Sequence, residues 1–361
     1  MPKGNSHPPL NVVLWGWIAS QGLQPLRKNV HTPCRFWPIT DPARKRTLPP
    51  ELARADVVVG SVFTEPMARA TPRLKLLQST GAGVDGFCLN AISPHTTVAN
   101  AYFHGPAIGE YVMMMILALN RDLMRMDAHF RRGVWYESSL WGAPPPAEIQ
   151  GKTLGLIGYG HIGKEVAARA RAFGMKVWVI SAHPPARKPK HVDSYEGSGG
   201  FRDLLRAADY LVIACPLNED TRGLIGKREF GLMKRTACLI NVARGPVVEE
   251  EALYHALQTH RIQGAAIDVW YQYPKDKRPT APSRFPFHKL DNILMTPHVA
   301  GWMKGTQDNR FKLIAANIDR LAAGQQLENV LQGPHRQRAA KAQEKVKRQN
   351  AKGKNEEPHQ E

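Results

Sequence analysis

The sequence is poor in the features that mark membrane-spanning, metal-bound and disulfide-linked proteins. Its 361 residues include four cysteines, whose spacing fits neither a metal site nor a disulfide framework: Cys34, Cys88, Cys215 and Cys238. The longest apolar run, residues 111–119, is too short to cross a bilayer. The first residues lack the apolar segment of a signal peptide. We therefore expect a cytoplasmic protein with reduced thiols, no metal site and no membrane partner.

Acidic side chains are scarce relative to basic ones. The chain has 49 Lys and Arg against 31 Asp and Glu, which gives a formal net charge of +18. This charge is spread along the chain, since residues 335–361 hold eight Lys or Arg against four Glu. A positive field attracts polyanions or small anionic ligands. Because no zinc-ligand set and no aromatic-and-basic RNA motif accompany it, nucleic-acid binding is not favoured.

The most informative segment present is a glycine turn at residues 158–163, with the sequence Gly158-Tyr159-Gly160-His161-Ile162-Gly163. The apolar run before it suits a buried strand, and apolar positions recur at helical spacing over residues 164–173. Gly158 permits the tight turn, Gly160 the close approach of a pyrophosphate, and Gly163 the packing of helix on strand. The helix N-terminus offers N–H groups to phosphate. We predict a dinucleotide site here, and an ordinary turn that binds nothing is the alternative.

Apolar runs of strand length alternate with helical patterns through most of the chain, which predicts an α/β protein with doubly wound parallel sheets. The length suggests two domains. Strands are expected at residues 11–17, 57–61, 74–79, 154–157, 176–180, 210–214, 237–242, 264–269 and 292–295. Helices are expected at residues 106–131, 164–173, 201–208, 230–233, 249–258 and 305–325, with short helices or turns at 49–55 and 64–70.

One further motif precedes the glycine turn, and four more follow it along the chain. They are Gly81-Ala82-Gly83-Val84-Asp85, Cys215-Pro216-Leu217 with Thr221, Asn241-Val242-Ala243-Arg244-Gly245, Asp268-Val269 and Thr296-Pro297-His298. As an ordered set over about residues 50–331, they resemble the D-2-hydroxyacid dehydrogenase family, which is D-isomer specific and NAD(P)-dependent.

This resemblance implies two Rossmann-like domains with the active site in the cleft between them. Residues 1–104 and 304–333 would form a flavodoxin-like substrate domain, and residues 105–303 the NAD(P)-binding Rossmann domain. The helix at 106–131 resembles the one that the family uses for dimer contacts, so a homodimer is expected. Residues 334–361 are rich in charge, Gln, Asn and Gly, and are expected to be a disordered basic tail.

The resemblance also implies roles for single residues. Arg244 resembles the arginine that clamps the substrate carboxylate and carbonyl, and His298 resembles the general acid/base. Ala82 and Gly83 resemble the backbone donors to the substrate carboxylate. The positions expected to bind the cofactor, with Asp268 at the nicotinamide carboxamide, are Gly158, Gly160, His161, Ile162, Gly163, Ser181, Arg187, Cys215, Pro216, Thr221, Val242, Ala243, Asp268 and Gly301.

One departure from the family concerns the partner of His298. The family's glutamate normally precedes a proline 29 residues beyond the arginine, and Tyr273-Pro274 stands there in this chain. A carboxylate beside an imidazole raises the imidazole pKa and fixes its tautomer. A tyrosine can orient the ring through its hydroxyl but carries no charge at neutral pH. Hydride transfer remains compatible with this change, although the acid/base step is altered.

A second departure concerns the ribose of the cofactor. The acidic residue expected about 20 residues past the glycine turn binds the 2′-hydroxyl of NAD and repels a 2′-phosphate. Ser181 stands there, and Arg187, Lys188 and Lys190 follow. NADP(H) is therefore favoured over NAD(H). A solvated loop without a phosphate partner is the alternative for these basic residues.

The sequence thus predicts an oxidoreductase that interconverts a 2-oxo acid and a D-2-hydroxy acid by hydride transfer. One alternative is a dinucleotide-sensing interaction protein with little or no catalysis. Another is a dehydrogenase whose substrate needs no proton transfer, as in the related formate enzymes, which also replace the acidic partner of the histidine.

Overall fold

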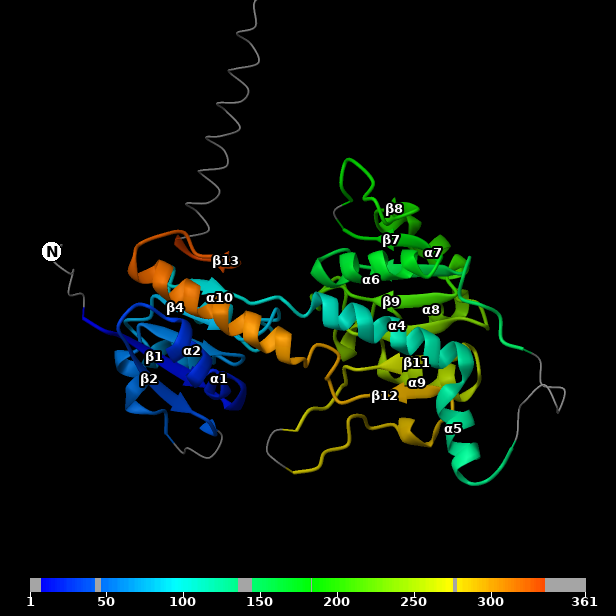
Figure 1. Cartoon of the computed structure of the whole chain (residues 1–361), viewed down its shortest axis with the longest axis horizontal. Helices are drawn as coiled ribbons and strands as arrows, with labels where there is room; N and C mark the ends of the chain where they lie inside the picture. Colours follow the sequence, from blue (N-terminus) through cyan, green and yellow to red (C-terminus); the bar gives the residue numbers. More distant parts are fainter. Residues whose placement is uncertain (1–7, 43–46, 136–144, 183, 275–277, 335–361) are drawn as a thin grey trace, which may run out of the picture. The chain divides into compact units, whose positions relative to one another are not determined.

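The computed structural model describes residues 8–42, 47–135, 145–182, 184–274 and 278–334. The expected tail lies outside these ranges apart from Pro334. The chain divides into two compact units, His104–Thr306 and Met1–Phe103 with Gln307–Glu361. Each unit has its own sheet of mainly parallel strands. Figure 1 shows the helices and strands of both units.

The 104–306 unit is built on a seven-stranded parallel sheet. In spatial order its strands are β12 (Ile293–Met295), β11 (Gly264–Ile267), β10 (Cys238–Asn241), β9 (Tyr210–Ile213), β6 (Thr153–Ile157), β7 (Lys176–Ile180) and β8 (Ser194–Glu196). Its helices are α4 (Gly105–Arg121), α5 (Leu123–Arg131), α6 (His161–Ala172), α7 (Phe201–Ala207), α8 (Lys227–Leu232) and α9 (Glu250–Gln258).

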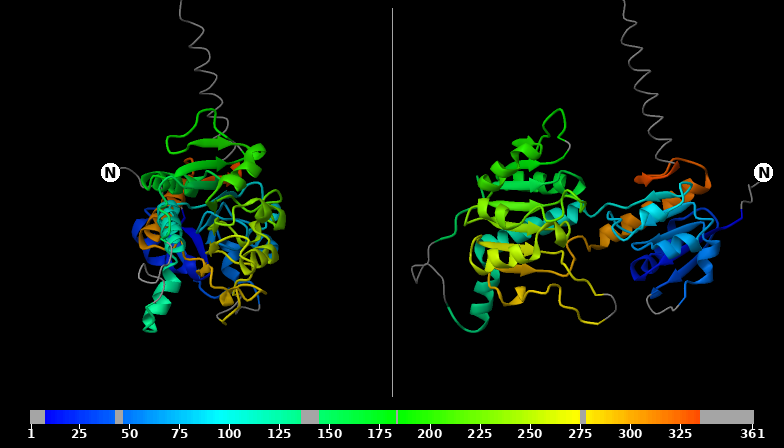
Figure 2. Two further views of the ribbon diagram at one scale, coloured as in Figure 1. Left: turned by 90° about the vertical axis from the view of Figure 1, so that its right-hand side faces the viewer. Right: turned by 180° about the vertical axis from the view of Figure 1, so that it is seen from behind.

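Side-chain alternation along these strands supplies two cores. Leu154 and Leu156 of β6 pack with α4 and α6 on one face of the sheet, whereas Ile157 packs with α7, α8 and α9 on the other. The helices therefore cover both faces (Figures 1 and 2). Strands β6 and β9 are neighbours in space but far apart in sequence, so the strand order reverses between them. Ligands of doubly wound sheets bind at the carboxyl ends of strands beside such a reversal.

The other unit carries a six-stranded sheet, parallel except for its last strand. Its strands in spatial order are β13 (Val330–Gln332), β5 (Thr97–Ala99), β4 (Leu76–Ser79), β3 (Val57–Gly60), β1 (Leu10–Trp15) and β2 (Cys34–Ile39), with β13 antiparallel to β5. Its helices are α1 (Trp17–Gln21), α2 (Leu23–Asn29), α3 (Glu65–Ala70) and most of α10 (Lys304–Ala322). Helix α10 buries Phe311, Ile314 and Ile318 against one face of this sheet.

The predicted fold class of two doubly wound parallel α/β units is confirmed. The single helix predicted at residues 106–131 is wrong, because α4 ends at Arg121 and α5 begins at Leu123. Between them Asp122 has a φ of 50°, a left-handed conformation that Asp tolerates better than most residues.

Several elements were not predicted because they lack a continuous apolar run. Strand β2 lies at the sheet edge, contains Arg35 and Pro38, and alternates between partly buried and exposed positions. Proline is tolerated there because an edge strand need not donate on both sides. Strands β5, β8 and β13 are three residues long, which is too short for a periodic signal.

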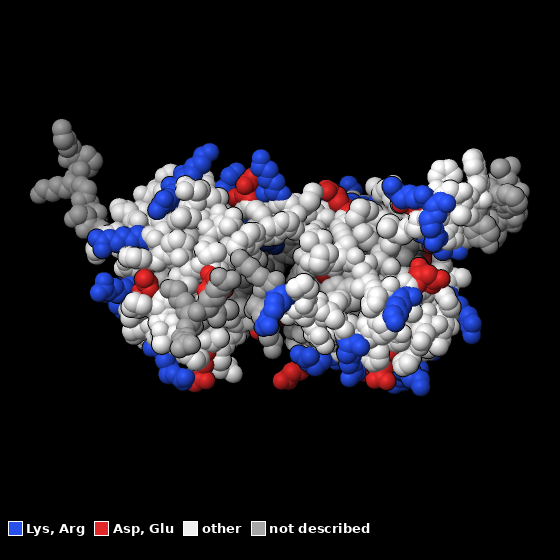
Figure 3. Space-filling view, turned by 90° about the horizontal axis from the view of Figure 1, so that it is seen from below, with Lys and Arg blue, Asp and Glu red and all other residues white. Residues whose placement is uncertain are grey.

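Basic side chains are distributed rather than clustered. On the face seen in Figure 3, Lys and Arg are scattered over both units and Asp and Glu lie among them. No helix within the described ranges is long and apolar enough to cross a membrane.

Candidate active site

The glycine turn joins β6 to α6 and has the geometry that a phosphate-binding turn requires. Gly158 has a φ of 96°, and a Cβ there would lie 2.8 Å from the backbone nitrogen of Cys215. A Cβ at Gly163 would lie 2.4 Å from the carbonyl oxygen of Gly158. A Cβ at Gly160 would meet nothing within 4 Å, so that side of the turn is open. Two glycines are thus required by packing, whereas Gly160 leaves room for a ligand.

The first turn of α6 completes this arrangement. Its N-cap is Gly160, and no side chain caps the helix. The N-terminal N–H groups of a helix bind anions when no side chain occupies them. The helix begins at His161 and Ile162, three residues before the start at residue 164 that the sequence predicted. These residues fit the pyrophosphate of a dinucleotide.

Six of the remaining predicted cofactor residues lie just beyond the carboxyl ends of neighbouring parallel strands. Ser181 follows β7, Cys215 and Pro216 follow β9, Val242 and Ala243 follow β10, and Asp268 follows β11. Burial raises the pKa of the Cys215 thiol to about 11, so this thiol stays neutral. Thr221 is held in a turn, where its hydroxyl donates to the carbonyl oxygen of Pro216 at 2.7 Å. Gly301 lies against His104: a Cβ added to Gly301 would lie 3.1 Å from the Cβ of His104.

The segment after β7 presents basic side chains. The N–H of Ser181 donates to the carbonyl oxygen of Glu196 on β8 at 3.1 Å. Lys188 donates to the carbonyl oxygen of Asp193 at 2.8 Å, while Arg187 is exposed. Glu196, to which no sequence motif points, accepts a hydrogen bond from Ser194 at 2.8 Å. The sheet edge therefore carries an acid as well as the expected bases, although that acid has a partner of its own.

Arg244 is positioned by a fixed turn after β10. The buried side chain of Asn241 donates to the carbonyl oxygen of Arg244 at 3.0 Å and accepts from the N–H of Ala243 at 3.0 Å. One guanidinium nitrogen of Arg244 donates to the carbonyl oxygen of Ala243 at 2.7 Å. Gly245 follows where a Cβ would lie 2.4 Å from the carbonyl oxygen of Trp270, so only glycine fits. Hydrogen bonds and close packing therefore fix the backbone that carries Arg244.

The turn that carries His298 is held by Asp268. This buried carboxylate accepts from the hydroxyl of Thr296 at 2.6 Å and from the N–H groups of Val299 and Ala300 at 2.8 and 3.0 Å. Tyr111 of α4 lies 2.6 Å from the Thr296 hydroxyl. Since Thr296 donates its proton to Asp268, Tyr111 is the donor to Thr296.

This anchoring explains an unusual backbone conformation. His298 has a φ of 58°, which is uncommon for a residue with a Cβ and costs free energy unless the surroundings impose it. Three hydrogen bonds to one carboxylate impose it here. The sequence suggested Asp268 only as a cofactor contact, and nothing in it pointed to Tyr111. Both residues fix the histidine.

His298 also meets Tyr273, the residue at the family's glutamate position. The Tyr273 hydroxyl lies 2.9 Å from Nδ1 of His298, and the two rings meet edge-on with centroids 5.6 Å apart. The N–H of Trp270 donates to the same hydroxyl at 3.2 Å. Burial raises the Tyr273 pKa, while the Trp270 hydrogen bond and the positive charge of Arg244 partly oppose the shift. The hydroxyl therefore keeps its proton at neutral pH.

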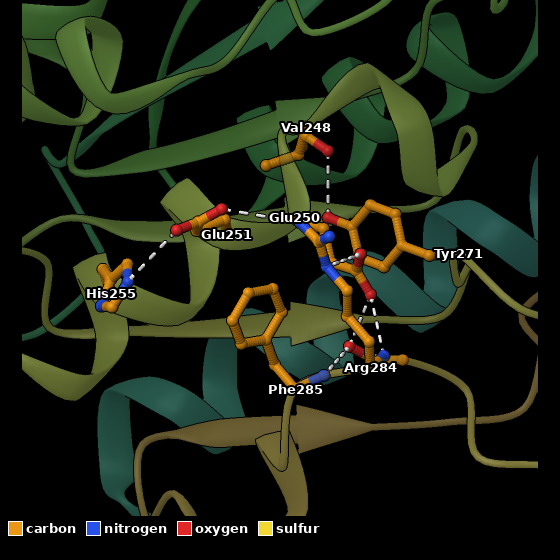
Figure 4. A network of polar contacts seen from close by, with 8 residues as sticks. Val248, Glu250, Glu251, His255, Tyr271, Arg284 and Phe285 are labelled. Atoms are coloured by element: carbon orange, nitrogen blue, oxygen red, sulfur yellow. Dashed lines mark hydrogen bonds and ion pairs between the residues drawn. The ribbon is translucent and has the colours of Figure 1, made fainter.

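The loop that carries Tyr273 is fastened to α9 by a polar network (Figure 4). Glu250 accepts from the hydroxyl of Ser283 at 2.7 Å and from the N–H of Arg284 at 3.1 Å. The Arg284 side chain pairs with Glu250 at 3.2 Å and, at 3.5 Å, with Glu251. The hydroxyl of partly buried Tyr271 donates to the carbonyl oxygen of Val248 at 3.0 Å. These bonds flank Tyr273 on both sides in sequence.

The predicted substrate-carboxylate donors belong to the other unit, after β4. Ser79 donates to the carbonyl oxygen of Gly83 at 3.0 Å, and Asn100 donates to that of Ala82 at 2.8 Å. Both side chains hold the loop by its carbonyl groups. In the part of the chain that the structure describes, the N–H groups of Ala82 and Gly83 donate no hydrogen bond. Backbone N–H groups without an internal acceptor are a feature of anion-binding loops.

No group of three or more His, Cys, Asp or Glu side chains among the described residues is placed to hold a metal ion.

Comparisons with known proteins agree with this geometry. The sequence model described as D-isomer specific 2-hydroxyacid dehydrogenase, NAD binding domain, matches residues 113–300. A glyoxylate reductase of Thermococcus gammatolerans is 30% identical over 319 residues, covering 83% of this chain and 89% of that protein. A solved acyclic imino acid reductase in complex with NADPH and D-arginine is 26% identical, with a TM-score of 0.71, covering 89% of this chain and 100% of that one.

A D-3-phosphoglycerate dehydrogenase of Methanocaldococcus jannaschii is 31% identical over 296 residues, covering 81% of this chain. The alignment covers 54% of that protein, so the chain spans about half the length of the phosphoglycerate dehydrogenases that it matches. The 104–306 unit contains the whole of the match to the family's NAD binding domain. The resemblance predicted from the ordered motifs is therefore confirmed, and the chain belongs to the D-isomer specific 2-hydroxyacid dehydrogenase family.

Proposed function

We propose that the protein is an NAD(P)-dependent oxidoreductase that interconverts a 2-oxo acid and a D-2-hydroxy acid. The observation that carries the proposal is the His298 turn. An acid/base side chain in a left-handed conformation is held by Asp268 and contacted by Tyr273, at the same sheet edge as an open glycine turn. Such strain is typical of functional sites.

In this proposal each residue has a separate task. Arg244 binds the substrate carboxylate through its planar guanidinium and polarises the carbonyl. His298 gives a proton to the carbonyl oxygen during reduction and takes it back during oxidation. Ala82 and Gly83 bind the substrate carboxylate through their N–H groups. The nicotinamide, when bound, supplies or accepts the hydride. Tyr273 orients His298.

The cofactor is proposed to lie along the carboxyl ends of the 104–306 sheet. Gly158, Gly160, Gly163, His161 and Ile162 would hold its pyrophosphate. The other contacts proposed are Ser181, Arg187, Cys215, Pro216, Thr221, Val242, Ala243, Asp268 and Gly301. NADP(H) is preferred in this proposal, because Ser181 removes the repulsion of a 2′-phosphate and exposed Arg187 can pair with it.

We propose as well that residues 105–303 act as the cofactor domain, and residues 1–104 with 304–333 as the substrate domain. A homodimer through α4 and α5 is supported by large apolar side chains exposed on these two helices. They are Met114, Leu123, Met124 and Phe130, each more than half exposed. Light scattering of the protein and of a Met114→Glu variant tests this, because a charge in an apolar interface opposes association.

The decisive experiment is a panel of 2-oxo acids with NADPH and with NADH, followed at the reduced-nicotinamide absorbance. Turnover of a 2-oxo acid supports the proposal. Clear dinucleotide binding without turnover of any substrate favours the sensing protein instead.

A second candidate is the reduction of a 2-imino acid. The observation in its favour is Tyr273, because a protonated imine accepts hydride without a further proton and so does not need a carboxylate behind the histidine. The similar acyclic imino acid reductase adds support. Including a 2-oxo acid with excess ammonia or alkylamine in the panel separates the two: amine-dependent cofactor oxidation would identify the imine as the substrate.

A further inference from the structure

We propose that Tyr273 is a positioning residue that fixes the tautomer of His298. Its hydroxyl donates a hydrogen bond to Nδ1, so neutral His298 carries its proton on Nε2. The proposal rests on the proposed function in one respect, since it names Nε2 as the atom that meets the substrate oxygen.

The Tyr273 hydroxyl has only one hydrogen to donate. Its oxygen already accepts the N–H of Trp270, a group that can only donate. If the hydroxyl donates to Nδ1 of His298, a lone pair serves the Trp270 contact and the single hydrogen serves the His298 contact. If Nδ1–H donated instead, the oxygen would accept twice and its hydrogen would need a third partner. Among the described residues Tyr273 has no third polar contact, so that hydrogen would be left to solvent, which reaches this 45% exposed residue.

One residue, Trp270, holds both Tyr273 and the His298 turn in place. The indole nitrogen of Trp270 donates to the carbonyl oxygen of Thr296 at 2.9 Å, at the start of the His298 turn. Its backbone N–H simultaneously holds the Tyr273 hydroxyl. The short contact between Tyr273 and Nδ1 is therefore built into the fold and does not depend on two mobile side chains meeting.

Burial is the main influence on the Tyr273 hydroxyl and raises its pKa. The Trp270 hydrogen bond and the charge of Arg244 lower this pKa, and the charge of Asp268 raises it. A tyrosine with a raised pKa is a neutral donor throughout the physiological range.

The consequence differs from that of a carboxylate at this position. A carboxylate can only accept, so it would hold the proton on Nδ1 and leave Nε2 bare in the neutral ring. Nε2–H would then exist only in the imidazolium. With Tyr273, the neutral ring already presents Nε2–H as a hydrogen-bond donor to a carbonyl oxygen. A neutral histidine can polarise a carbonyl in this way, as the neutral histidine of triosephosphate isomerase does.

The test is the tautomer itself, read from two-bond proton–nitrogen correlations in protein labelled with ¹⁵N-histidine. The His298 signals are those that disappear in His298→Gln. We expect the Nε2–H form above the titration of the ring, and a loss of that preference in Tyr273→Phe. Tyr271→Phe is the matched control. It removes a hydroxyl from the same loop, but that hydroxyl bonds to Val248 and not to His298. It should leave the His298 signals unchanged.

An Nδ1–H tautomer in the parent protein would overturn the proposal, and so would an unchanged tautomer in a folded Tyr273→Phe variant. Neither reading needs substrate or cofactor. A protein with the Nε2–H tautomer that reduces no 2-oxo acid would refute the proposed function and leave this inference standing.

Discussion

The hydroxyl of Tyr273 lies 2.9 Å from Nδ1 of His298, at the position where the family's glutamate was expected. Tyrosine in place of the family's glutamate therefore keeps a hydrogen bond to His298 but brings no negative charge next to its ring. What is altered is the stability of the imidazolium, because a neutral partner does not favour a positive ring as a carboxylate does.

Restoring that charge gives the first prediction. A carboxylate in Tyr273→Glu favours the imidazolium, so the histidine stays protonated to higher pH. Reduction needs the protonated group, and its kcat/KM should fall at a higher pH than in the parent. Tyr273→Gln, which is similar in length but uncharged, is the control and should not move the profile upward. An unchanged profile in active Tyr273→Glu would mean that the shorter side chain does not act on His298.

The second prediction separates two glycines of one turn. Gly163→Ala places a Cβ 2.4 Å from a backbone oxygen and should destabilise the protein by about 1–3 kcal/mol. Gly160→Ala meets nothing within 4 Å, so its melting temperature should stay close to the parent's, while dinucleotide affinity falls because the methyl occupies the phosphate approach. Calorimetry and cofactor titration measure the two effects. Full affinity in Gly160→Ala would place the phosphate elsewhere.

The third prediction concerns Arg244. Arg244→Ala should lower turnover by roughly a hundredfold or more, because a positioned charge is lost where charge develops. Cofactor affinity should change little. Arg228→Ala, an exposed arginine on α8, is the matched control and should keep parental turnover. Steady-state kinetics with the best 2-oxo acid measures this, and parental turnover in Arg244→Ala would remove the arginine from the site.

The fourth prediction tests the cofactor preference. Ser181→Asp should raise the Kd for NADPH, since its carboxylate repels a 2′-phosphate, and should leave or improve that for NADH. Fluorescence titration of both cofactors against both proteins gives four constants, with NADH as the internal reference. Equal affinities of the parent protein for the two cofactors would contradict the preference for NADPH.

The fifth prediction concerns the network behind Tyr273. Glu250→Gln weakens charge-assisted bonds to Ser283 and Arg284 and should cost about 1 kcal/mol, or a few degrees in Tm. The Arg284 side chain is 62% exposed, although that of Glu250 is only 16% exposed, so solvent screens the ion pair and the pair itself contributes little of this. Glu251→Gln removes only an exposed partner and should leave Tm unchanged. Equal effects of the two variants would show that Glu250 does not anchor the loop.

The central strands and the glycine turn could be predicted from the sequence because their signals are local. Strand β7 contains a continuous apolar run, Val177 to Ile180, on both sheet faces, and its predicted bounds match the structure. The glycine turn lies between a strand and a helix that are adjacent in sequence, so its geometry follows from a few neighbouring residues. Edge strands such as β2 carry no comparable signal, since only one side of an edge strand is paired and burial is partial.

The order of the motifs determined the family, and the residues at its expected positions could be read directly, including the exchange of glutamate for Tyr273. Whether that tyrosine meets the histidine could not be read. Tyr273 and His298 lie 25 residues apart, and their contact depends on how two loops leave β11 and β12. The bonds that decide it come from distant parts of the chain: Tyr111 through Thr296 to Asp268, and Glu250 to Ser283. Contacts of this kind arise when the sheet brings strand ends together, so only the tertiary structure settled the partner of the histidine.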